Sequence, residues 1–189
     1  MIGPLLNGRG GFLAGQLGAP KIYPALTAIA QEYTMSGLDG DAEGGYYILG
    51  MLYLNGAASS YALRTNGLTT NQKGAYTSKD LAPATNVQVA TLQFTAADAL
   101  TAPAWMDFEC RVTQARRSIG GVASYRTFKV WASVHSAAAG ADTYRYEFSG
   151  SWRETSTNLT SLSVFASGGS YLLAGSQMIV YPTPAPFTL

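Results

Sequence analysis

"WMDFECRV", residues 105–112, places apolar and charged side chains at alternate positions. This period of two is typical of an antiparallel strand with one face in a core and the other in solvent. The alternation predicts an inward face of Met106, Phe108, Cys110 and Val112 and an outward face of Asp107, Glu109 and Arg111. Cys110 is the only cysteine of the sequence, so the chain forms no internal disulfide, and its apolar neighbours predict a buried, unreactive thiol.

The strand pattern extends in both directions from this segment. Alternation or short apolar runs recur in seven further segments: 46–54, 60–67, 87–94, 124–136, 143–152, 159–167 and 176–182. The run "YYILGMLYL" (46–54) is apolar at both odd and even positions, which predicts a strand buried on both faces. Eight segments separated by turn signals, without an amphipathic helix, predict an all-β fold, an antiparallel jelly-roll-like β-sandwich of about eight strands.

The two ends of the chain differ from the strand region. Residues 1–32 are rich in Gly and Pro and show no sustained period, yet they are too apolar for a solvated linker. We therefore expect an extended arm that docks on another subunit. Residues 33–182 form the predicted sandwich domain, and residues 183–189 a stiff Pro-rich tail. The predicted interface residues are Leu5, Leu6, Phe12, Leu13, Leu17, Ile22, Tyr23, Trp131 and Phe187.

The composition is globular but poor in charge. Apolar residues make up 47% of the chain and charged residues only 12%, where about 25% is average. A surface with so few charges predicts coverage by partner subunits. The net charge of +1 gives no field toward nucleic acid or a membrane, and no apolar run reaches the roughly 18 residues of a membrane span. Without a secretion signal, synthesis in a cytoplasm is expected.

Residues that could carry chemistry are few. His135 is the only histidine, which excludes a zinc site built from several histidines, and no G-x-S-x-G elbow supplies a nucleophile for a triad. Asp107 and Glu109 would lie about 7 Å apart on one strand face, a spacing compatible with a glycosidase but also common on exposed strands. We expect no catalytic residue and no cofactor.

The acidic stretch "DGDAEGG" (39–45) leaves two alternatives open. Asp39, Asp41 and Glu43 stand at alternate positions, as in the first half of a calcium loop. Position 50 is Gly where an EF-hand would place its bidentate Glu, and no helices are expected on either side. The stretch is therefore either a weak cation loop or a solvated turn before a strand.

Three parts of the sequence resemble small structural proteins of tailed bacteriophages. The segment "SGLDGDAEGGYYILGMLYL" (36–54) is similar to their first strand, and "YALRTNG" (61–67) to a following strand with a polar signature. The most specific part is "LTSLSVFASGGSYLLAGSQMIVYP" (159–182), which resembles their Gly-rich ending, although this chain has Tyr181–Pro182 where the pattern has Tyr-Gly. The resemblance covers about residues 34–182. It implies a virion component, capsid-decorating or associated with tail fibres, without catalytic residues.

Three functions remain to be compared. The first is a structural virion protein, made in the host cytoplasm and expected to be a homotrimer. It would bind the major capsid protein or other virion proteins through its arm and sandwich edge and stabilise the shell as a cement protein. The second is a receptor- or glycan-binding module of a tail or fibre, in which exposed Tyr and Trp side chains stack on host sugars. The third, least supported, is a hydrolase with Asp107 as its best candidate.

Overall fold

The computed structural model describes residues 17–55, 60–79, 85–89, 91–94, 104–113, 125–136, 143–154 and 157–183. Within these ranges the chain forms β-strands and no helix, and so no helix that could cross a membrane. The strands are β1 (Lys21–Tyr23), β2 (Glu32–Ser36), β3 (Gly45–Leu54), β4 (Tyr61–Thr65), β5 (Gln72–Lys79), β6 (Thr85–Val89), β7 (Leu92–Gln93), β8 (Ala104–Thr113), β9 (Arg126–Ser136), β10 (Thr143–Trp152), β11 (Ser161–Ala166) and β12 (Gln177–Thr183).

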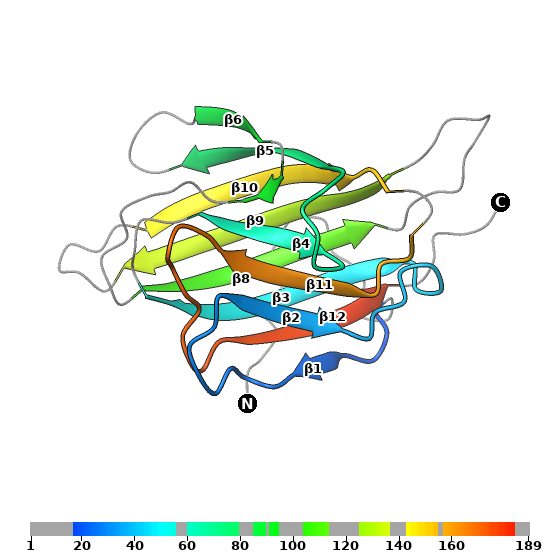
Figure 1. The fold of residues 1–189 in the computed structure, drawn as a ribbon, viewed down its shortest axis with the longest axis horizontal. Helices are drawn as coiled ribbons and strands as arrows, with labels where there is room; N and C mark the ends of the chain where they lie inside the picture. The colour runs from blue at the N-terminus through cyan, green and yellow to red at the C-terminus, as the bar shows by residue number, and fades with distance from the viewer. Residues whose placement is uncertain are drawn as a thin grey trace.

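The strands build two antiparallel sheets that pack face to face (Figure 1). The larger sheet has eight strands in the order β1-β12-β3-β8-β9-β10-β5-β6, and the smaller has four in the order β2-β11-β4-β7. In Figure 1 the strands β2, β11 and β4 lie in front of the larger sheet, of which β1 forms the lower edge and β6 the upper edge. The predicted all-β sandwich is confirmed, with twelve described strands instead of about eight.

The chain crosses repeatedly between the two sheets. Strands β2 to β5 alternate between the small and the large sheet. β7 and β11 also belong to the small sheet, and the strands before and after each of them belong to the large sheet. Crossings of this kind produce the two-layer arrangement of a jelly roll. The meander β8-β9-β10 widens the large sheet between β3 and β5, so the four-stranded sheet leaves part of it without a facing strand.

The core lies between the sheets and follows the alternation read from the sequence. The four side chains of β8 that were predicted to face inward, at positions 106, 108, 110 and 112, are at most 3% exposed. Tyr46 and Leu52 of β3 and Phe128 of β9, on the two strands that neighbour β8, are among the largest fully buried side chains. Burial of this apolar surface stabilises the pairing of the two sheets by about 25 cal/mol per Å² removed from water.

Three strands and one strand break were missed by the sequence prediction. β1 lies wholly and β2 partly in the predicted arm. β5 is a polar segment, and its position in the sheet depends on backbone pairing with β10. Gly74 of β5 lies under the ring of Phe148, where a Cβ atom would come within 2.2 Å of the ring. The predicted strand 87–94 is divided between β6 in the large sheet and β7 in the small one.

The prediction that residues 46–54 are buried on both faces is wrong. One face of β3 lies in the core, but on the other Leu49 is 36% exposed, Met51 45% and Tyr53 38%. The small sheet covers only one side of the large sheet, so in the part of the chain that the structure describes no second layer of strands lies over the other face of β3.

Residues 17–32, the described part of the predicted arm, lie along the chain's own large sheet. Gly18 N donates to Pro182 O at 2.7 Å, and β1 then pairs with β12. Leu26 N donates to Ser176 O at 2.9 Å, and Ala30 N to Leu172 O at 3.0 Å. This part of the segment therefore completes one edge of the sandwich, whereas residues 1–16 lie outside the described ranges.

Candidate functional site

The side of the large sheet that faces away from the small sheet carries the most unusual surface of the described residues. We call it the outer face. Its members, identified by alternation and burial, are Ile22 of β1, Gln177, Ile179 and Tyr181 of β12, Tyr47, Leu49, Met51 and Tyr53 of β3, Trp105, Asp107, Glu109 and Arg111 of β8, Lys129, Trp131, Ser133 and His135 of β9, and Thr143, Arg145, Glu147 and Ser149 of β10.

One half of the outer face, on β1, β12 and β3, is apolar. The pairing places Ile22 opposite Ile179, and Ile179 opposite Leu49, so three aliphatic side chains form a row across three strands. Ile22 is 65% exposed. The rings of Tyr47 and Tyr181 lie beside this row with their centroids 6.4 Å apart. Since water contacts these side chains in the isolated chain, covering them is favourable.

The other half, on β8 and β9, combines charges with aromatic rings. Arg111 Nη2 lies 3.4 Å from Glu109 Oε1, and its guanidinium carbon lies 5.6 Å from the Tyr47 ring centroid and 5.3 Å from that of Trp131. These contacts place the Arg111 guanidinium between the two rings. Burial, and then the charge of Glu109, raise the pKa of Tyr47 to about 12. This half thus neutralises its central charges within the chain.

The single histidine belongs to a short polar chain at one end of the outer face. His135 Nε2 lies 3.3 Å from Asp107 Oδ2, and His135 Nδ1 lies 3.2 Å from Thr143 Oγ1. The imidazole stacks on Trp105 with 5.1 Å between ring centroids. A hydroxyl, an imidazole and a carboxylate in line are the components of a triad, but the Asp107 side chain is 62% exposed. Water therefore competes for its hydrogen bonds, unlike the buried carboxylate that orients a catalytic histidine.

The acidic stretch distributes its carboxylates among separate partners. Asp39 Oδ1 accepts hydrogen bonds from Ala42 N and from Asn158 Nδ2, and the amide of Asn158 holds the pKa of Asp39 below its usual value. Asp41 accepts from Arg126 Nη2 at 2.6 Å.

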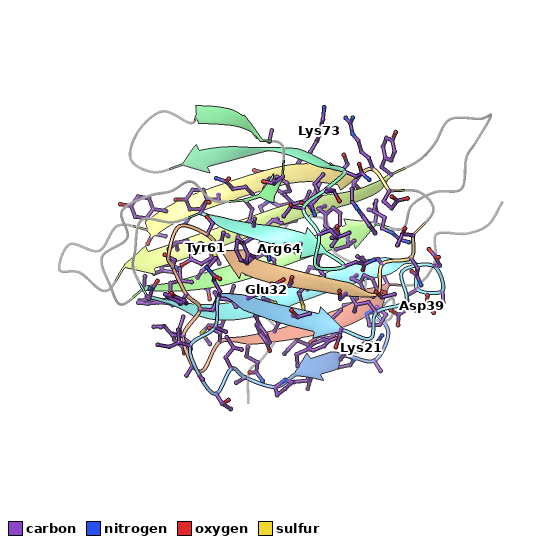
Figure 2. The ribbon with its side chains drawn as sticks, in the orientation of Figure 1. Lys21, Glu32, Asp39, Tyr61, Arg64 and Lys73 are labelled. Carbon is purple, nitrogen blue, oxygen red and sulfur yellow. The ribbon has the colours of Figure 1, made fainter. Side chains whose placement is uncertain are left out.

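Glu43 completes this pattern, because its carboxylate pairs with Lys21 Nζ at 2.8 Å. Figure 2 shows Lys21 and Asp39 at the same end of the sandwich. The carboxylates brace this corner of the fold, and the described ranges contain no group of three His, Cys, Asp or Glu side chains that could hold a metal ion. The structure therefore favours the turn over the cation loop.

The predicted interface residues fall into three groups. Leu5, Leu6, Phe12, Leu13 and Phe187 lie outside the described ranges. Leu17 is half-buried at the sheet edge, and Tyr23 packs partly against the core while its hydroxyl donates to Ser36 O at 2.5 Å. Ile22 and Trp131 lie on the outer face.

Sequence reasoning missed most of the outer face. Leu49, Met51, Tyr53, Trp105, Ile179 and Tyr181 were not named as interface residues. The signal was present in "YYILGMLYL", since a strand apolar on both sides needs a cover on both sides. The sequence alone could not show that the chain supplies only one of the two covers.

Comparison with known proteins adds no relative to this description. No protein-family model, no curated protein and no solved structure matches the chain.

Proposed function

We propose that this chain is a non-enzymatic structural protein of a tailed-bacteriophage virion, which decorates the capsid and stabilises its shell. The main support for the proposal is that the two terminal segments begin at the same corner of the sandwich. Gly18 is hydrogen-bonded to Pro182, so residues 1–16 and residues 184–189 both start from one corner of the large sheet. The resemblance of residues 34–182 to phage structural proteins supports the same assignment.

Attachment would proceed by burial of apolar surface at this corner. Residues 1–16 can reach up to about 50 Å when extended, enough to cross a neighbouring capsid subunit. The tail begins beside them and can contact the same neighbour. Several copies around one point of the shell would then bind by avidity, which strengthens the attachment without new contacts.

A second candidate function is supported by the aromatic end of the outer face. Tyr53 and Trp105 are each 38% exposed, pair across β3 and β8, and lie beside the exposed carboxylate of Asp107. Aromatic rings next to a carboxylate can bind a sugar, which is the property of a receptor-binding module in a tail or fibre. A glycan array that gives no hit with the purified chain would count against this alternative.

Deleting residues 1–16 tests the proposal. A longer deletion through residue 32 would also remove β1 and the hydrogen bonds of Leu26 and Ala30, and so would confuse attachment with folding. We expect the shorter variant to keep the wild-type melting temperature but to be absent from purified particles. A variant lacking residues 184–189 measures how much the tail contributes to attachment to the particle.

Copy number distinguishes the two candidates. A capsid-decorating protein is present in hundreds of copies per particle, and a tail or fibre component in far fewer, which quantitative gel analysis of purified virions can measure. Particles that incorporate the variant lacking residues 1–16 at the wild-type level would contradict attachment through the arm.

A further inference from the structure

We infer that the outer face of the large sheet is a self-complementary interface, by which two copies of this chain pack sheet against sheet. The inference goes beyond the proposed function, because it names the contact between copies and not the contact with the shell. It rests on three observations: the two-sided apolar character of β3, the separation of apolar and charged halves, and the order of the charges along β8.

None of the described strands packs over the apolar half. Every outward side chain of β3 between Tyr47 and Tyr53 is aliphatic or aromatic, and Leu49 and Met51 are 36% and 45% exposed. The other solvent-facing layer of the sandwich, on the small sheet, provides an internal comparison.

That layer is polar. Its outward positions include Thr34 of β2, and Arg64 of β4 pairs with Glu32 at 3.1 Å and lies over the Phe165 ring (Figure 2). The two outward faces of one chain therefore differ in composition, and only that of the large sheet has the character of a covered surface.

The arrangement of the two halves selects the symmetry. The apolar half lies on β1, β12 and β3, and the charged half on β8 and β9. A two-fold axis in the plane of contact, directed across the strands, places the apolar half of one copy on the apolar half of the other. A two-fold axis along the strands, between β3 and β8, would instead place the apolar half on the charged half, which moves charged side chains from water onto an apolar surface.

The order of the charged residues along β8 is consistent with the same two-fold axis. Along β8 the acidic positions Asp107 and Glu109 precede the basic position Arg111, which pairs across to Lys129 of β9. An axis that crosses the strands between Glu109 and Arg111 places the row of Glu109 and Glu147 in each copy opposite the row of Arg111 and Lys129 in the other, while Arg145 of β10 lies one row further from the axis, in the row of Asp107. In this register Leu49 lies opposite Tyr47 of the second copy, because β3 pairs these residues with Glu109 and Arg111.

The size of the face is comparable with that of the smaller specific interfaces, which bury about 600 Å² on each partner. With strands about 4.8 Å apart and outward side chains about 6.7 Å apart along a strand, the face from β1 to β10 measures about 24 Å by about 20 Å. The projected area is about 500 Å², and the accessible area of such a corrugated surface is larger. A standard interface buries about 800 Å² of accessible surface on each partner.

A symmetric pair predicts an even number of copies. The homotrimer expected from the sequence would use two different patches of each subunit, whereas a two-fold contact uses one patch twice. The purified full-length chain should therefore form dimers, or an assembly of an even number of chains, at about 100 μM, where any interface with a Kd below about 10 μM is largely occupied. Sedimentation equilibrium measures this number.

Two sets of variants test the contact itself. Leu49→Lys should weaken association at least tenfold, and Thr34→Lys, which places the same charge on the polar face of the small sheet, should leave it unchanged. Glu109→Arg and Arg111→Glu should each weaken self-association, but an equimolar mixture of the two should associate again, because acidic and basic ends then face each other in the mixed pair. Circular dichroism of each variant checks the fold.

Three results would contradict the proposed contact between two copies. A wild-type chain that is monomeric or trimeric at about 100 μM would overturn the inference and leave the outer face to a different virion protein. Unchanged association of Leu49→Lys, or a mixture that does not associate, would also overturn it. Since only isolated protein is used, none of these results depends on whether the chain is found in particles.

Discussion

Replacing Arg126 by methionine should destabilise the fold. The main reason is that a buried backbone carbonyl loses its hydrogen-bond donor, and the loss of an ion pair adds less. The side chain of Arg126, at the start of β9, is only 3% exposed. Its Nη1 donates to Gly40 O at 2.8 Å and its Nη2 to Asp41 Oδ1 at 2.6 Å. A Cβ atom on Gly40 would lie 2.6 Å from Nη1, so the guanidinium packs directly against the Gly40 backbone.

The two contacts contribute unequally to the free energy of unfolding. The side chain of Asp41 is 68% exposed, so solvent screens the ion pair, and its loss costs about 0–1 kcal/mol. Loss of the charged donor to the carbonyl of Gly40 costs about 1–3 kcal/mol, because a buried acceptor is left unsatisfied. The Arg126→Met variant should therefore lose about 1–4 kcal/mol, or roughly 2–4 °C of melting temperature per kcal/mol.

Urea denaturation of Arg126→Met and Asp41→Asn, followed by tryptophan fluorescence, distinguishes the contacts. Asp41→Asn keeps the donor to Gly40 and should shift the free energy of unfolding by at most about 1 kcal/mol. If the two variants lose equal stability, the ion pair and not the hydrogen bond to the Gly40 carbonyl stabilises this loop.

Three further predictions use other parts of the fold. Gly74→Ala should lower the free energy of unfolding by about 1–3 kcal/mol in urea denaturation, because the added Cβ would lie 2.2 Å from the Phe148 ring; a wild-type midpoint would contradict this packing. Burial raises the pKa of the Cys110 thiol, so a thiol reagent at about pH 8 should label the protein only after unfolding, and rapid labelling of the native protein would show an accessible thiol. The lowered pKa of Asp39 stabilises the fold above the pKa of the unfolded chain, and this stability is lost as the pH falls. Asn158→Ala should reduce the loss of stability between about pH 6 and pH 3, and an unchanged pH profile would show that this amide does not act on Asp39.

The sequence predicted the strands whose side chains alternate. In β8 the four predicted inward positions 106, 108, 110 and 112 point inward, and β10 spans the predicted range 143–152. Local composition was sufficient there, because a period of two places each side chain on a known face once the segment is extended. β5 lacked this pattern, since its position depends on pairing with β10 and on the contact between Gly74 and Phe148.

For the candidate site, too, the sequence could not show which residues contact one another. The sequence predicted Ile22 and Trp131 as interface residues, and the structure places both side chains on the outer face, with Ile22 65% exposed. It could not show that the carboxylates of Asp39, Asp41 and Glu43 have separate partners, because Asn158, Arg126 and Lys21 come from distant parts of the chain.

The sequence by itself therefore determined that the chain is all-β and which side chains of each alternating strand share a face. The tertiary structure alone decided which of the two faces of β3 is covered. Both faces are apolar, so hydrophobicity cannot distinguish them, and the four-stranded sheet can pack on only one side of the larger sheet. The choice depends on contacts between segments far apart in the chain, and it leaves the outer face exposed in the isolated protein.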